Sequence, residues 1–205
     1  MFTALYSCSQ TLANYLTARL ASVAGLGFGS GGVRQVSLLS PEAMRTELKV
    51  EGLSVWLYRV DRDDMRLNQP DLRISATEVR RPPLPLRLHY LMTPVTFNGA
   101  TGGSPQIEQT ILGRVLQALH SRPILQGTDL DGTDLEGSEA EFHARIEALA
   151  LDDVSRVWEA LEGGFKLCVP YEVSLANIAP DLDPLRVAPV SLLLPETALV
   201  VGDGA

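Results

Sequence analysis

Histidines are the residues of this chain best suited to acid–base or metal chemistry, and their spacing argues against both. His89, His120 and His143 fall in separate predicted elements, and the chain holds neither an HExxH pair nor a GxSxG serine. His89 and His143 could approach each other on neighbouring strands, but no third ligand is visible. We therefore expect exposed or half-buried imidazoles, and we predict no catalytic, metal or cofactor residue and no enzymatic activity.

The first cluster of carboxylates in the sequence is Asp61-Arg62-Asp63-Asp64, which follows an apolar segment. Three carboxylates so close together could hold a divalent cation, because such ions prefer oxygen ligands. Charged residues next to the end of a strand usually face water. The arrangement favours the solvated tip of a hairpin over a metal site.

A second acidic segment, Gly127 to Glu136, reads GTDLDGTDLE and contains a short internal repeat. Its carboxylates suggest a calcium-binding loop, but their spacing does not support one. When Gly132 is aligned with the glycine of a twelve-residue calcium loop, Gly127 takes the first position and Ser138 the last. Both required carboxylates are then missing, so we expect an exposed acidic loop.

Five glycines within eight residues mark the segment Gly25 to Gly32. A phosphate-binding loop normally follows a strand, opens a helix and ends in Lys-Ser or Lys-Thr. This segment follows a predicted helix and lacks that ending. We expect a flexible connector, while a nucleotide-binding enzyme that uses this loop stays a minor alternative.

The composition limits the class of partner. The chain has 205 residues, is 45% hydrophobic, and carries a formal net charge of −8, which is enough sequence for one full core. Nucleic-acid binding depends on cations that neutralise phosphates, so this acidic balance disfavours it, and it disfavours an anionic membrane in the same way. We expect no nucleic-acid partner and no membrane partner.

The cysteines and the N-terminal segment indicate a cytoplasmic protein. Cys8 and Cys168 have no CxxC spacing, and we expect both to be small buried residues in a reducing compartment. The first helix lacks a basic leader region, and Asn14, Thr17 and Arg19 interrupt its apolar character. We expect neither a signal peptide nor an anchor.

The predicted strands and helices that position the histidines and carboxylates are organised around the segment Arg80 to Thr93. Prolines at 82, 83 and 85 require an extended approach, after which apolar residues alternate from Leu86 to Met92, as in a central strand. Leu53 to Val60 is apolar on both faces and predicts a neighbouring central strand. Residues 72–76 are expected to be the strand that returns beside 53–60 after the hairpin tip at 61–64. Further strands are expected at 33–39, 142–148 and 167–175, with Pro170 at a sheet edge or strand end.

Helices are predicted at 3–23, from about 105 to 121, and from 152 to about 161 by apolar residues at helical spacing. Ser40-Pro41-Glu42 is a turn or a helix start. Trp158 shares the apolar stripe of the last helix, so we expect it to anchor that helix on the sheet. The fold class is α/β of the α+β type, with a central mixed or antiparallel β-sheet flanked by helices.

Three segments in order resemble a known family: the proline run with its LHYLMT strand, the helix that ends at RPIL (112–125), and the Trp-bearing helix 154–161. They are similar to the cap, or tail-terminator, family of phage-tail-like contractile injection systems over roughly residues 1–180. The resemblance implies a homohexameric ring that binds the inner tube protein and the sheath protein and stops their growth. A neck, tube-initiating or baseplate adaptor of the same machine stays an alternative.

The chain is expected to divide into a cap domain, 1–180, and an extended C-terminal arm, 181–205. Prolines at 184, 189 and 195 prevent a continuous helix in the arm, yet the arm is rich in apolar residues. The residues predicted to contact the sheath or a neighbouring subunit are Val187, Val190, Leu192, Leu193, Leu194, Leu199 and Val200. The arm either folds back on its own domain or adds as a strand to a neighbouring sheet.

Overall fold

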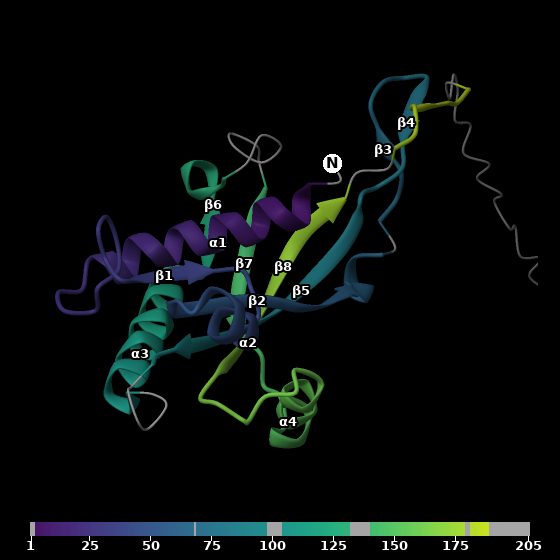
Figure 1. The fold of residues 1–205 in the computed structure, drawn as a ribbon. Helices are drawn as coiled ribbons and strands as arrows, with labels where there is room; N and C mark the ends of the chain where they lie inside the picture. Colours follow the sequence, from purple (N-terminus) through teal and green to yellow (C-terminus); the bar gives the residue numbers. More distant parts are fainter. Residues whose placement is uncertain (1–2, 68, 98–103, 132–139, 179–180, 189–205) are drawn as a thin grey trace, which may run out of the picture.

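The computed structural model describes residues 3–67, 69–97, 104–131, 140–178 and 181–188. Its main feature is a six-stranded sheet in the order β1-β2-β5-β8-β7-β6 (Figure 1). The strands are β1 (Arg34–Ser37), β2 (Glu51–Arg62), β5 (Leu84–Val95), β6 (Ile124–Gln126), β7 (Glu141–Ile146) and β8 (Val169–Ile178). β1 pairs with β2 in parallel and every other pairing is antiparallel, so the expected mixed sheet is confirmed.

Strand β5 lies inside this sheet, as the sequence predicts, between β2 and β8. Its side chains alternate between two faces. Leu88 and Tyr90 are fully buried in the main core, whereas Leu91 belongs to a second, smaller cluster. The central strand is therefore covered on both sides.

Helices α1 (Ala4–Ala21) and α3 (Pro105–Ser121) cover the main-core face of the sheet (Figure 1). α3 is amphipathic, whereas α1 buries a broad side that includes Ser7, Ser9 and Thr11, and the two helices also contact each other. The buried Tyr15 hydroxyl donates a hydrogen bond of 2.9 Å to the Ala118 carbonyl oxygen, which joins the two helices. Both predicted helices are confirmed, and within the described residues no helix could span a membrane.

Helix α4 (Leu151–Ala160) packs on the other face of the sheet. Trp158 is buried with Val154 against Leu91, and its indole N–H donates to the Cys168 sulfur at 3.4 Å. The predicted anchoring role of Trp158 is confirmed. Cys168 is half-buried just before β8, and Cys8 is fully buried in α1.

Short elements join β1 to β2. They are α2 (Pro41–Ala43), capped by the Ser40 hydroxyl, and a π-helical turn, η1 (Met44–Leu48). Gly52 then brings β2 against β1 at φ +147°, where an added Cβ would lie 1.8 Å from the Gln35 carbonyl oxygen. Only glycine fits this approach. Two short 3-10 turns lie elsewhere, η2 (Asp64–Arg66) and η3 (Gly127–Asp129).

A second, small sheet corrects one prediction. Residues 72–76 do not return into the main sheet, because β2 and β5 pair directly with each other from Gly52–Val95 to Arg62–Leu86 and leave no place between them. Instead β3 (Leu72–Arg73), β4 (Glu78–Arg80) and β9 (Leu185–Arg186) form a three-stranded sheet. This sheet projects away from the body (Figure 1).

The glycine-rich segment is attached to the core rather than being a free connector. Leu26 and Phe28 are buried, and the Arg34 N–H donates to the Gly27 carbonyl oxygen at 2.9 Å. Alternating apolar side chains hold the loop while its glycines make the turns. Pro170 occupies a strand end and not a sheet edge, since β8 lies between β5 and β7.

Candidate functional site: a charged groove on the sheet

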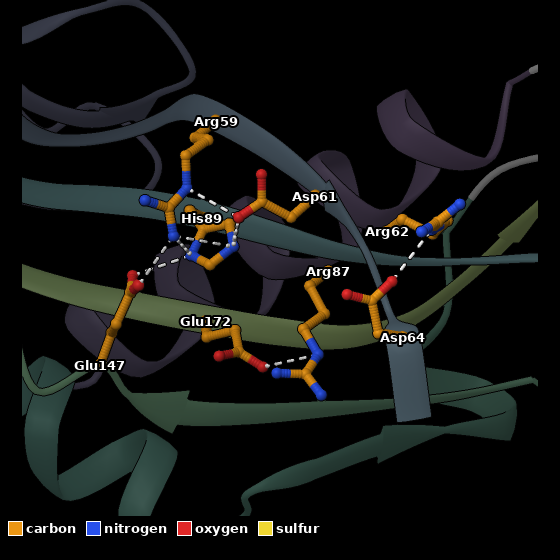
Figure 2. A pocket seen from close by; sticks show the side chains of 8 residues that line it. All are labelled: Arg59, Asp61, Arg62, Asp64, Arg87, His89, Glu147 and Glu172. Atoms are coloured by element: carbon orange, nitrogen blue, oxygen red, sulfur yellow. Dashed lines mark hydrogen bonds and ion pairs between the residues drawn. The ribbon is translucent and has the colours of Figure 1, made fainter. Parts of the chain in front are cut away.

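A charged groove of about 540 Å³ lies on the face of the sheet that carries α4 (Figure 2). Its walls come from β2, β5, β8 and the segments that follow β2 and β7. The described lining residues are Arg59, Asp61, Arg62, Asp64, Arg87, His89, Glu147 and Glu172. Three arginines thus face four carboxylates around one imidazole.

A β-bulge in β2 directs two of these side chains into the groove. The register of β2 against β5 shifts between Leu57 and Arg59, and after the shift Arg59 lies opposite His89 and Asp61 opposite Arg87. An extra residue in one strand re-aims the side chains that follow it. Without the bulge, Arg59 and Asp61 would point to the core face.

His89 lines the groove and is itself only 3% exposed. Its Nδ1 lies 2.9 Å from Glu147 Oε2 and its Nε2 lies 3.2 Å from Asp61 Oδ2. Arg59 Nη2 lies 3.2 Å from His89 Nδ1, and it also donates a hydrogen bond of 3.2 Å to Glu147 Oε1. The expectation of an exposed or half-buried imidazole is wrong for His89, because a full set of charged partners compensates its burial.

Tyr58 contacts two of the groove residues, Glu147 and His89. Its hydroxyl donates to Glu147 Oε2 at 3.3 Å, and its ring stands edge-on to His89. Burial, followed by the nearby Glu147 carboxylate, raises the pKa of Tyr58 to about 12. Tyr58 therefore acts as a neutral hydrogen-bond donor.

His143 does not meet His89. His89 pairs with Glu172 on one side of β8, and His143 pairs with Ser174 on its other side, so a whole strand separates the imidazoles. No cluster of three or more His, Cys, Asp or Glu side chains able to hold a metal ion occurs among the described residues.

Asp63 corrects the prediction of a solvated hairpin tip. It is buried and accepts from Arg87 Nη2 at 2.7 Å and from the Met65 N–H at 3.2 Å. The Arg87 hydrogen bond holds the pKa of Asp63 below its usual range, and the same contact raises the pKa of Arg87. Asp61 and Asp64 are exposed, but each is paired with an arginine of β2, so this segment forms ion pairs and not a cation site.

Glu172 links the groove to β7. Its Oε1 accepts from Arg145 Nη2 at 2.5 Å and lies 3.7 Å from Arg87 Nε. The resulting network crosses four strands and holds its side chains in fixed positions. Among the described residues that line the groove there is no serine, threonine, cysteine or lysine to serve as a nucleophile. Fixed charges of both signs on an open surface are suited to recognising a polar partner.

The remaining sequence-predicted residues lie elsewhere. His120 is exposed at the end of α3, and burial raises the pKa of the Cys8 thiol to about 12. In the acidic segment, Asp129 pairs with Arg122 and Asp131 accepts from the Asn14 amide, which leaves neither carboxylate free. The rest of that segment, 132–136, lies outside the described residues.

Only one of the predicted arm contacts is described. Val187 is half-buried beside the small sheet, and its N–H donates to the Thr77 carbonyl oxygen at 2.8 Å. The other predicted contacts lie outside the described residues: Val190, Leu192, Leu193, Leu194, Leu199 and Val200.

Sequence reasoning missed the groove residues Arg59, Arg87, Glu147 and Glu172. One signal was available in β5, where Arg87 and His89 alternate with apolar residues on a strand that is buried on both faces. Charged residues on a covered strand require partners from neighbouring elements. The sequence does not say which elements supply them.

Known proteins share this architecture. One is the sheath/tube terminator of PVC, an extracellular contractile injection system, in its extended state: identity is 16%, the TM-score is 0.54, and the match covers 92% of this chain and 64% of that one. Another is the tube-terminating cap of the anti-feeding prophage, with 16% identity and a TM-score of 0.52; this match covers 90% of this chain and 59% of that one. The chain thus spans less than two thirds of either structure's length. No curated protein matches it.

Similarity at this level of identity shows a shared fold, while the family comes from the sequence itself. The family described as Pvc16 N-terminal domain matches residues 7–191. The resemblance to cap and terminator proteins that the three sequence segments predicted is confirmed. Since the match extends over most of the chain, this protein belongs to the Pvc16 N-terminal domain family.

Proposed function

We propose that this protein is a structural assembly protein that forms a ring and caps the inner tube and contractile sheath of a phage-tail-like contractile injection system. The observation that carries the proposal is the fold, which follows two tube terminators over 92% and 90% of the chain. Both of those structures are terminators, which favours a cap over a neck, tube-initiating or baseplate adaptor.

The ring is proposed to contain six copies and to assemble in the cytoplasm of the producing cell. Closed rings arise when one surface of a subunit binds a different surface of the next copy and the rotation closes. The inner tube protein and the sheath protein are the proposed partners, and a structural role is proposed in place of catalysis.

The charged groove is proposed to contact one of these partners. The buried groove residues His89, Glu147 and Glu172 are paired with other residues of the chain. Arg62 and Asp64 pair with each other, and both are largely exposed. Complementary charges select the correct partner and orientation more than they raise affinity. A polar surface also leaves the free subunit without an apolar patch at this position.

Exchanging the two exposed charges tests this role. Arg62→Asp combined with Asp64→Arg keeps the ion pair but reverses the pattern that a partner meets, so we expect a folded protein that caps fewer particles. The matched control exchanges Arg122 and Asp129, which form an ion pair outside the groove. Equal capping by both variants would remove the groove from the interface.

The C-terminal arm, residues 181–205, is proposed to tie the cap domain, residues 1–180, to the sheath or to a neighbouring subunit by strand addition. Truncation after Ala188, which keeps β9 in the small sheet, separates the two outcomes for the rest of the arm. Strand addition predicts a truncated domain that folds but leaves the particle, whereas an arm that serves only its own domain predicts a loss of stability. A folded, fully particle-bound truncation would refute a docking role.

Deleting the protein from the producing cell tests the function itself. A terminator sets the end of the tube, so the deletion should give overlong or disordered tubes and unstable sheaths, and the full chain supplied from a plasmid should restore normal lengths. Electron microscopy of purified particles measures both. Particles of normal length and stability without the protein would contradict the proposal.

A further inference from the structure

A second pocket, of about 280 Å³, lies between helices α1 and α3 near their C-terminal ends (Figure 1). It belongs to the face of the sheet that these helices cover, whereas the charged groove lies on the face that carries α4. We call it the arginine pocket. Its described lining residues include no carboxylate, and they are Tyr15, Arg19, Arg114, Gln117, Ala118, Ser121 and Arg122.

Arg114 joins the two helices across this pocket without meeting a carboxylate. Its Nε donates to the Arg19 carbonyl oxygen at 3.1 Å. Its Nη1 donates to Gln117 Oε1 at 2.8 Å, and its Nη2 donates to the Ser22 hydroxyl at 3.0 Å. All three acceptors are neutral, so they hold the guanidinium in place and leave its charge uncompensated. Both Nη atoms keep a second N–H for another acceptor.

The other two arginines of the pocket add to this charge. The Arg19 guanidinium stands over the Tyr15 ring at 5.0 Å from its centre, and the Arg19 side chain forms no ion pair or hydrogen bond with another described residue. Arg122 does have an acidic partner, because its Nη2 contacts Asp129 Oδ2 at 2.5 Å. The pocket therefore keeps an excess of positive charge in a chain whose formal net charge is −8.

The helices themselves do not supply the missing carboxylates. The sequence of α1 contains no acidic residue. That of α3 contains only Glu108, which lies in the first turn, away from the pocket, and accepts from the Thr96 hydroxyl. The anion that would balance Arg19 and Arg114 must come from outside these two helices.

The donors of the pocket suit carboxylates better than phosphates. Phosphate sites commonly add backbone N–H groups from a helix N-terminus or a glycine-rich turn. Two helices end at the arginine pocket, so the backbone there presents carbonyl oxygens and the negative ends of two helix dipoles, which oppose a doubly charged group. Guanidinium groups by themselves bind a carboxylate through paired hydrogen bonds.

We propose that the arginine pocket binds an acidic segment of a neighbouring protein, whose carboxylate side chains contact Arg19 and Arg114. Clusters of arginine are a recurrent means of recognising acidic motifs. Complementary charges also fix orientation, which a subunit needs when it meets the end of a tube. The inference rests on the proposed cap function in one respect, since it takes the neighbour to be a component of the particle.

Binding of fluorescein-labelled hexaglutamate to the full-length chain, followed by fluorescence anisotropy, tests the site. The wild-type protein should bind this peptide and not the matched hexaglutamine, and binding should weaken as salt screens the charges. Arg19→Gln should weaken binding about tenfold, because it removes charge-assisted hydrogen bonds to the peptide. The matched control is Arg156→Gln on α4, an exposed arginine outside the pocket, and it should bind as the wild type does.

Gln117→Glu separates binding from the structural role that cations have at the end of a helix. The new carboxylate would replace the amide oxygen that accepts from Arg114 Nη1, so it supplies negative charge from within the chain. Hexaglutamate binding should fall about tenfold, whereas the Tm should stay equal or rise because an ion pair replaces a neutral hydrogen bond. A lower Tm together with unchanged binding would contradict the proposal.

Three other results would overturn the proposal. The first is hexaglutamate that does not bind the wild-type protein, or that binds Arg19→Gln as tightly. The second is inorganic phosphate that displaces hexaglutamate at a lower concentration than the dicarboxylate glutarate does, which would make this a phosphate site. The third concerns the chain's own acids outside the described residues: Asp134→Asn, Glu136→Gln and Glu139→Gln together should leave binding unchanged, and tighter binding would identify that segment as the occupant.

Particles distinguish this inference from the cap function. Cells whose only copy carries Arg19→Gln or Gln117→Glu should produce fewer capped particles, as counted by electron microscopy. Fully capped particles from variants that fail to bind hexaglutamate would refute a neighbour within the particle and leave the cap function in place. Normal particles after deletion of the protein, beside an unchanged peptide result, would contradict capping and still support the pocket.

Discussion

The ion pair between Arg87 and Asp63 gives the sharpest test of how the groove is built. Replacing Arg87 by alanine removes the 2.7 Å contact to a carboxylate that is 5% exposed. Asp63 keeps only the Met65 N–H as a hydrogen-bond donor. The substitution therefore leaves a buried charge without its main partner, which is the costly way to break an ion pair.

The expected loss in free energy of unfolding is about 3 kcal/mol, at the low end for a buried pair because Arg87 itself is partly exposed. For a chain of this size that lowers the Tm by about 6 to 12 °C. Adding Asp63→Asn removes the stranded charge, so the double variant should recover part of the loss. Urea denaturation followed by circular dichroism measures both quantities.

The loss should depend on pH, with a sign fixed by Asp63. Arg87 lowers the pKa of Asp63 in the folded state, so the stabilisation is fully present above the unfolded-state pKa of about 3.9 and disappears as the pH falls through the folded pKa. The difference between the wild-type protein and Arg87→Ala should therefore be full at about pH 7 and shrink toward about pH 3.

A control is Arg62→Ala, which breaks the ion pair with Asp64, whose two side chains are both largely exposed. Surface pairs contribute at most about 1 kcal/mol, so this variant should lose much less. The reasoning is refuted if Arg87→Ala is no less stable than Arg62→Ala, or if its loss of stability is unchanged across the acidic range.

Three further substitutions or modifications have defined outcomes. Gly52→Ala should destabilise the fold by about 3 kcal/mol or more in urea, since its Cβ would lie 1.8 Å from the Gln35 carbonyl oxygen; near-wild-type stability would contradict that close approach. Trp158→Ala should cost about 3 to 5 kcal/mol by the same measurement, and a loss below about 1 kcal/mol would show that α4 is not anchored there. An alkylating reagent should modify half-buried Cys168 before Cys8, whose burial raises its pKa to about 12; mass spectrometry showing Cys8 modified first would disprove its burial.

The sequence predicted the elements whose pattern is local. In β5, prolines followed by alternating apolar residues identified the central strand and both of its faces. The apolar stripes of α1 and α3 and the position of Trp158 were equally readable, because helical spacing determines them. Pairing order is less local, and residues 72–76 were wrongly placed in the main sheet for that reason.

The candidate site depends on contacts that no local pattern contains. The bulge near Tyr58 turns Arg59 toward His89, and it is visible only in the register of β2 against β5. Glu147 lies in the segment after β7, 88 residues away from Arg59 in the sequence. A histidine that looks half-exposed in isolation is therefore buried among charges, and Asp63 lies at 5% exposure where a solvated tip was expected.

The most direct measurement is a cryo-electron microscopy reconstruction of the particle end that lies opposite the baseplate. The account predicts six copies of this chain in a closed ring that touches the last layer of tube and the last layer of sheath. A ring of two or three copies, or a chain located at the baseplate instead, would contradict the cap function.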